Sequence, residues 1–242
     1  MKTITKISMA LAAILFIGCS SPKVETETKN QPSAEYLALQ DSLSAAPGFV
    51  LSDAMTEVKI GEDGTLMILK NAETGHNYAS GANLWRVFYN THEEKEMQID
   101  GTENKPVVSQ DGNTITIAYK DLVHRGKALD MDLTLTVTLE EGAVRFGSTI
   151  ANNEAGTIIR ELQYPLVGNM QLPEGHKLLT THTGGQLHDD AIDLIVNVNP
   201  KTLYMKPDQY FRQYDLQYPR HAASNCYAFF GENDGLYFGS HD

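Results

Sequence analysis

The sequence is short of cysteine, of basic residues and of long apolar runs. Its 242 residues include 2 cysteines and 1 tryptophan, and 19 lysines and arginines stand against 31 acidic residues, for a formal net charge of −12. An excess of negative charge repels nucleic acid and anionic lipid headgroups, so neither is an expected partner. The apolar run at residues 7–17 is too short to cross a bilayer as a helix.

The first residues instead have the pattern of a bacterial lipoprotein signal. Lys2 and Lys6 give a positive start, the apolar run comes next, and Gly18 precedes Cys19. We expect residues 1–18 to be a signal peptide and Cys19 to carry acyl chains that hold the protein to a membrane, in the periplasm or at the cell surface (outer membrane). An ordinary secretory signal is the alternative.

Acylation of Cys19 would leave Cys226 alone, so no disulfide within the chain is expected. Cys226 lies in an aromatic-rich run, where a small buried hydrophobe is the favoured interpretation and a reactive thiol the alternative.

Residues 19–46 are rich in polar residues and predict a flexible tether. Tyr36, Leu37, Leu39 and Leu43 are near helical spacing, which favours one or two turns of helix before Pro47 and Gly48 interrupt it. The folded part is expected to span residues 47–242.

Long helical periodicity is lacking after residue 47, and strand patterns take its place. The clearest is residues 131–139, where five apolar residues alternate with polar ones, as in a strand with one buried and one wet face. Further strands are predicted at 58–60, 66–69, 84–89, 114–119, 144–150 and 158–166. We expect the strands at 131–139, 144–150 and 158–166 to form an antiparallel meander. The fold class predicted is an all-β antiparallel sandwich.

The last stretch, residues 218–242, predicts a hairpin. Short aromatic-rich runs at 226–230 and 236–239 flank Gly-Glu-Asn-Asp-Gly, which carries the residues of a tight turn. The sequence stops directly behind the second apolar run, whereas a domain normally ends in a polar tail or a docked helix. We therefore expect the sandwich to be incomplete at its C-terminus, with more chain downstream.

Two segments carry a resemblance to a known family. The first segment runs from Tyr218-Pro219 through an aromatic strand to Gly-Leu-Tyr-Phe-Gly-Ser-His-Asp at 235–242, and the second is residues 71–89. Together they resemble the N-terminal β-sandwich of lipoprotein glycoside hydrolases of gut-type Bacteroidetes. The resemblance implies a super-sandwich similar to galactose mutarotase, placed before a catalytic (β/α)₈ barrel. It covers residues 48–242 and no barrel, so it implies a non-catalytic part of a glycoside hydrolase whose catalytic domain is missing here.

Carbohydrate is the partner that this resemblance implies. Sugars stack on aromatic faces and bond to Asn, Asp, Arg or His, and the candidates in this sequence are Tyr210, Arg212, Tyr214, His221 and Trp85. Aromatic residues in strands are more often core, which is the favoured interpretation for Trp85. A free-standing glycan-binding lipoprotein of a polysaccharide-utilisation system is the alternative, and it would have to bury residues 236–238 without a partner domain.

Imidazole and carboxylate groups gather at residues 180–190, which predict a polar loop containing glycine. His182, His188, Asp189 and Asp190 are residue types that bind zinc, and the two aspartates could also hold calcium. Their spacing matches no defined metal motif, so a solvated loop is favoured over a divalent cation site, and no other cofactor is expected.

An aldose-epimerase-like enzyme is a third possibility. Opening a sugar ring needs a histidine acid and a glutamate base across the ring; His182, His188 and His221 could be the acid, and Glu161 or Glu174 the base. None of these residues matches a family pattern by position, so the epimerase is an analogy from the fold.

Overall fold

The computed structural model describes residues 11–14, 33–168, 170, 172, 175–182, 185–189 and 222–240. The chain divides into two compact units that meet in sequence at residues 171 and 172. The segment expected as a signal peptide contains a short strand, β1 (Leu11–Ile14). Over the described residues, no helix has the length and apolar character needed to cross a membrane.

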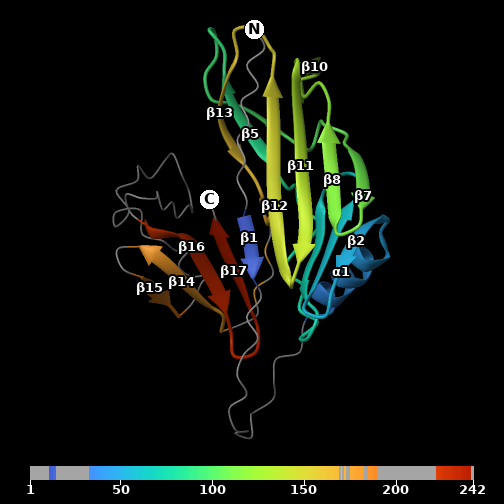
Figure 1. Cartoon of the computed structure of the whole chain (residues 1–242), viewed down its shortest axis with the longest axis vertical. Helices are drawn as coiled ribbons and strands as arrows, with labels where there is room; N and C mark the ends of the chain where they lie inside the picture. Colours follow the sequence, from blue (N-terminus) through green and yellow to red (C-terminus); the bar gives the residue numbers. More distant parts are fainter. Residues whose placement is uncertain are drawn as a thin grey trace, which may run out of the picture. The chain divides into compact units, whose positions relative to one another are not determined.

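The first unit is built on a four-stranded antiparallel sheet. Its strands lie side by side in Figure 1 in the order β12 (Ala143–Asn152), β11 (Met131–Glu140), β8 (Thr114–Tyr119) and β7 (Val107–Asp111). In β11 every second side chain is buried from Met131 to Leu139. The alternation in the sequence therefore predicts both the strand and its buried face correctly.

Two three-stranded sheets and a small ribbon complete the first unit. One sheet has the strand order β2 (Gly48–Ser52), β3 (Thr56–Gly61), β4 (Leu66–Asn71). The other has the order β13 (Ile158–Gln163), β5 (Arg86–Asn90), β6 (Met97–Asp100). The ribbon pairs β9 (Val123–His124) with β10 (Lys127–Ala128). The strands predicted at 58–60 and 66–69 are confirmed as the β3–β4 hairpin.

The predicted meander is wrong in its third strand. β13 leaves the main sheet and pairs antiparallel with β5, from Ile158 opposite Asn90 to Gln163 opposite Arg86. Hydrogen bonds hold the connection on this course, because Asn153 N–H donates to the Asp130 carbonyl at 2.8 Å and the Asn152 amide donates to the Thr157 carbonyl at 3.0 Å. These contacts turn the chain away from β12 instead of back along it.

The core of the first unit joins these sheets into a sandwich. Trp85 lies before β5 and packs edge-on against Tyr119 of β8, with 4.9 Å between ring centroids. Phe146 of β12 packs against Tyr164 in the same manner at 5.7 Å. Because these aromatic pairs link different sheets and bury large apolar surfaces, they stabilise the two-layer arrangement. The all-β sandwich predicted from the sequence is confirmed.

The helix α1 (Ala34–Ala45) corrects the expectation of a flexible tether up to residue 46. It is longer than the predicted one or two turns, begins at an N-cap where the Ser33 hydroxyl accepts from Tyr36 N–H, and buries Leu43. The ammonium group of Lys59, a buried residue of β3, donates to the carbonyls of Leu43 and Ser44 at 3.0 and 2.7 Å. A cation at the C-terminal end of a helix is favourable, so α1 is part of the first unit.

The described residues of the second unit after residue 171 form four antiparallel strands. Their order is β15 (Gln186–His188), β14 (Lys177–His182), β16 (Ala222–Phe230) and β17 (Gly235–Ser240). The predicted C-terminal hairpin is confirmed, since Tyr227 pairs with Phe238 and Phe230 with Gly235. Leu236 and Phe238 are buried in this structure, and His176 Nε2 lies 3.0 Å from Asp234 Oδ1 at the hairpin turn.

Candidate functional site

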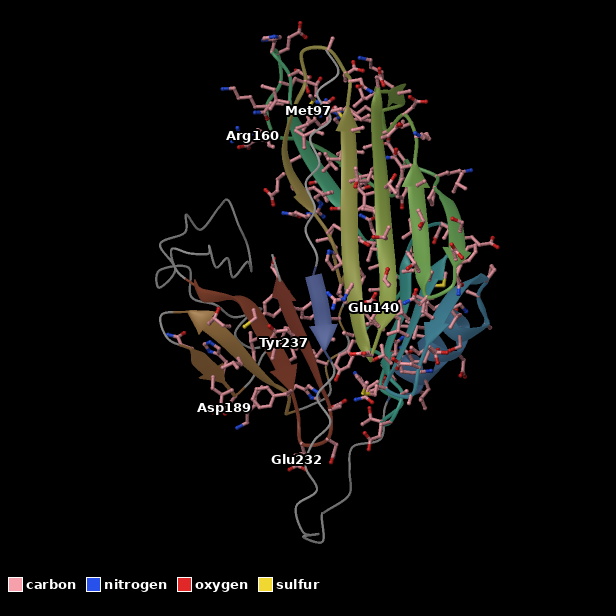
Figure 2. All side chains as sticks on the ribbon, viewed as in Figure 1. Met97, Glu140, Arg160, Asp189, Glu232 and Tyr237 are labelled. Carbon is pink, nitrogen blue, oxygen red and sulfur yellow. The ribbon has the colours of Figure 1, made fainter. Side chains whose placement is uncertain are left out.

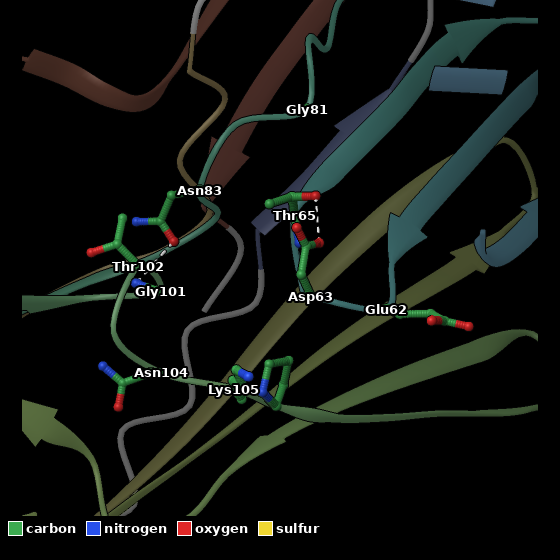
Figure 3. A pocket seen from close by; sticks show the side chains of 10 residues that line it. Glu62, Asp63, Thr65, Gly81, Asn83, Gly101, Thr102, Asn104 and Lys105 are labelled. Carbon is green, nitrogen blue, oxygen red and sulfur yellow. Dashed lines mark hydrogen bonds between the residues drawn. The ribbon is translucent and has the colours of Figure 1, made fainter. Parts of the chain in front are cut away.

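A groove on the first unit is the candidate site, and Figure 3 shows it from close by. Three segments line it: the β3–β4 turn at 62–65, residues 81–83, and residues 101–106, which come after β6. Its volume is about 650 Å³, which is within the range of small-molecule sites. All three segments belong to one compact unit, so the groove has a defined shape. We call it groove A.

Two glycines let the backbone near groove A approach the side chains behind it closely. A Cβ atom on Gly101 would collide with Asn83 Oδ1, and one on Gly64 would collide with the Tyr119 hydroxyl. Gly64 also has a φ of +81°, a backbone conformation that favours glycine. Trp85 lies behind this backbone, because its Nε1 is 3.6 Å from the same Cβ position on Gly101.

The amide side chains of groove A shape its backbone. Asn83 donates to the Trp85 carbonyl at 2.5 Å and accepts from Gly101 N–H at 3.1 Å. Asn104 is buried and bonds to Val123 through both its amide nitrogen and its oxygen. These hydrogen bonds hold the walls of groove A in place.

The charged side chains of groove A are the ones that can meet a ligand. Asp63 Oδ1 accepts from the N–H and hydroxyl of Thr65, which leaves Oδ2 as an acceptor. Lys105 supplies an ammonium donor from another of the three segments, and Glu62 a second carboxylate. The groove therefore combines acceptors and donors, the combination that hydroxyl-rich ligands need.

Burial and hydrogen bonds shift the pKa values of two residues near groove A, Tyr119 and Asp100. Burial raises the pKa of Tyr119 to about 12; its hydrogen bond with Trp85 lowers the pKa somewhat, and the negative charge of Asp63 raises it. At Asp100, burial raises the pKa, but the hydrogen bonds from Thr102 outweigh it and the net pKa is lowered. Tyr119 is therefore protonated and Asp100 ionised at neutral pH.

Among the described residues, the one sequence-predicted sugar contact is Trp85, and it does not line groove A. Trp85 is fully buried and packs against Tyr119, so the prediction that it contacts sugar is wrong and the core interpretation is correct. Tyr210, Arg212, Tyr214 and His221 lie outside the described residues, as does the lipidation candidate Cys19. Sequence reasoning misses groove A itself, because its walls extend from residue 62 to residue 106, a proximity that local pattern does not reveal.

The candidate metal residues are only partly described. The expected loop at 180–190 is instead a hairpin in part, since Thr180 pairs with Gln186 and Leu178 with His188. Asp189 is exposed and forms an ion pair with Lys177 at 3.0 Å, while the His182 side chain and Asp190 lie outside the described residues. Within the described part of the chain, no three His, Cys, Asp or Glu side chains group as metal ligands do.

The candidate epimerase residues are also partly described. Glu161 of β13 is exposed and accepts a hydrogen bond from Gln163 at 2.7 Å, and His188 of β15 is half-buried. Glu174 and His221 lie outside the described residues. The acid and base pair required for ring opening therefore stays a prediction.

Comparison with known proteins gives no relative. No protein-family model matches this chain, and neither curated proteins nor solved structures give a match. The functional inference therefore rests on the residues of this chain.

Proposed function

We propose that this chain is the β-sandwich portion of a membrane-anchored glycoside hydrolase, held in the periplasm or at the cell surface by Cys19. By itself it binds carbohydrate without cleaving it, and it helps to shape the substrate cleft of a catalytic barrel. The observation that carries the binding role is groove A, where the Asp63 carboxylate and the Lys105 ammonium group lie on walls fixed by engaged amides.

The chemistry of groove A favours a sugar over other small ligands. A sugar hydroxyl is both donor and acceptor, so it can donate to Asp63 Oδ2 while a neighbouring hydroxyl accepts from Lys105. The formal net charge of −12 disfavours polyanionic ligands at long range. A neutral oligosaccharide is therefore the ligand class that we propose.

A free-standing glycan-binding lipoprotein is the second candidate, because groove A would serve it equally well. The two candidates differ in the coding sequence downstream of residue 242. A coding sequence that continues into alternating strands and helices supports the hydrolase component, and a stop codon with a matching intact mass supports the binding protein. Either result leaves the binding role of groove A in place.

Isothermal titration tests the binding role directly. The full chain, purified in detergent, is titrated with oligosaccharides of glucose, mannose and galactose, beside a variant with Asp63→Asn and Lys105→Gln. The introduced asparagine keeps an oxygen for Thr65, so the turn should persist while the charge is lost. We expect binding at least about tenfold weaker, which corresponds to about 1.4 kcal/mol.

The control variant is Glu140→Gln, which changes a carboxylate of β11 that is labelled in Figure 2 and pairs with Arg145 outside groove A. It should bind like the unaltered chain. Unchanged melting temperatures would show that neither variant unfolds. Equal affinity of the groove variant and the unaltered chain would remove groove A as the site, and absence of binding to every sugar would refute the carbohydrate role.

A further inference from the structure

A second groove of the first unit carries an unusual set of ionisable side chains. Its walls are the end of β5, residues 91–97, the β9–β10 ribbon and residues 154–157, and its volume is about 480 Å³. Met97, labelled in Figure 2, lies on one of these walls. None of its lining residues is shared with groove A, so it is a separate surface feature. We call it groove B.

A tyrosine and a histidine are held together in groove B. Tyr89 is almost fully buried, and its hydroxyl lies 2.5 Å from His124 Nδ1, with the rings edge-to-face at 5.5 Å. Burial raises the pKa of Tyr89, so the phenol stays protonated. Because Tyr89 engages Nδ1, it fixes the imidazole orientation and leaves Nε2 as the ring nitrogen for a ligand.

The β9–β10 turn places two cations beside two acids. Arg125 and Gly126 have φ values of +52° and +75°, the backbone of a tight two-residue hairpin between His124 and Lys127. Arg125 then pairs with Glu94 at 3.1 Å, and Lys127 pairs with Glu154 at 3.4 Å. Each pair puts a donor next to an acceptor at the edge of the groove.

The Arg125–Glu94 pair is open to water, which makes it available to a ligand, with exposed fractions of 69% and 54%. In the second pair Lys127 is 72% exposed, whereas Glu154 is 23% exposed. Exposed pairs of this kind contribute little to stability. A ligand that bonds to both members of a pair can therefore reorganise them at low cost.

We infer that groove B is a second saccharide-binding site, which takes a neutral sugar through neighbouring hydroxyls; this inference rests on the proposed carbohydrate-binding function. One hydroxyl donates to a glutamate while its neighbour accepts from the paired arginine or lysine, and His124 Nε2 bonds to a third. Three lining acids, Glu93, Glu94 and Glu154, outnumber the two permanent cations. This balance disfavours a uronic acid.

The test uses the full chain in detergent and a variant with Glu94→Gln and Arg125→Gln, which removes one pair without changing net charge. The matched control is Lys120→Gln with Asp132→Asn, another surface ion pair in the first unit but outside groove B. Each protein is titrated with neutral oligosaccharides of glucose, mannose and galactose, and with oligosaccharides of the corresponding uronic acids. We expect the groove B variant to lose one of two binding events, weakened at least about tenfold, and the control to keep both.

The Asp63→Asn, Lys105→Gln variant separates the two claims. If it loses the other binding event and keeps the one that depends on Glu94 and Arg125, the two sites are independent. Neutral sugar binding that the groove B variant leaves unchanged would overturn the second site and leave the proposed function intact. Tighter binding of uronic acids than of neutral sugars at groove B would overturn the ligand class. Absence of any saccharide binding would overturn both the function and the inference.

Discussion

Replacing Asp53 with asparagine should destabilise the first unit in a pH-dependent manner. Asp53 lies between β2 and β3, and its carboxylate accepts from Met55 N–H and Thr56 N–H at 2.8 Å each through Oδ1. Its Oδ2 accepts from Gly142 N–H at 2.7 Å, in the turn between β11 and β12. This one side chain therefore fastens two sheets together.

The size of the effect depends on how much of this bonding asparagine can replace. An amide oxygen can accept from Met55 and Thr56, but the amide nitrogen would face Gly142 N–H, so one charge-assisted bond is lost and two donors oppose each other. A hydrogen bond to a charged group contributes about 1.5–3 kcal/mol. Asp53 is exposed, so water competes for its bonds and we take the low end, about 1.5 kcal/mol at neutral pH.

The pH dependence gives the sharper test. At Asp53 burial raises the pKa, but the hydrogen bonds from Met55, Thr56 and Gly142 outweigh it and the folded-state pKa is lowered. The stabilisation is thus fully present above the unfolded pKa of about 3.9 and is lost as pH falls through the lower folded pKa. Urea unfolding of both proteins between pH 3 and pH 7 should show the difference shrinking toward low pH. A difference that stays constant across this range would refute the charge as its origin.

Two further predictions concern the core and the helix. Burial raises the pKa of Tyr119 to about 12, so the stability that Tyr119 contributes is complete below about pH 10 and is lost as pH rises toward 12. In an alkaline titration, ultraviolet absorbance should show a late phase of tyrosine ionisation, together with a change in Trp85 fluorescence. Titration of every tyrosine near pH 10 would contradict this prediction. Leu43→Ala should lower the free energy of unfolding by about 2–3 kcal/mol, because Leu43 is buried. Leu37→Ala, on the exposed side of the same helix, should lower it by less than about 0.5 kcal/mol. Urea titrations measure both changes, and equal effects would show that α1 does not pack as described.

Local pattern predicts the strands, and distant contacts decide the rest. The two-residue alternation in β11 is a direct result of burial of one sheet face, so 131–139 can be assigned from sequence. The pairing of β13 with β5 cannot be assigned from sequence, because the pattern of one strand does not identify the strand that pairs with it. The docking of α1 depends on Lys59, a cation inside a strand whose carbonyl partners lie 15 and 16 residues earlier.

The candidate sites show the same limit more strongly. Tyr89 and His124 are 35 residues apart, and neither belongs to a recognisable motif, so groove B is visible only in the fold. Trp85 is a sugar-contact candidate by residue type alone, but residue type cannot say whether a ring faces the core or the solvent. The tyrosines and histidine at 210–221 stay predictions, because they lie outside the described residues.

The attachment of α1 has a mechanical consequence. If the protein is held at Cys19, as proposed, any pull from the membrane reaches residue 33 first and loads the helix before it loads β2. Unwinding residues 34–42, the part of the helix before the Lys59 contacts, from about 1.5 to about 3.4 Å per residue would release roughly 17 Å of chain. The helix would unwind while the Lys59 contacts at its C-terminal end stay intact. Little force would then be transmitted to the sandwich until this part of the helix is fully extended.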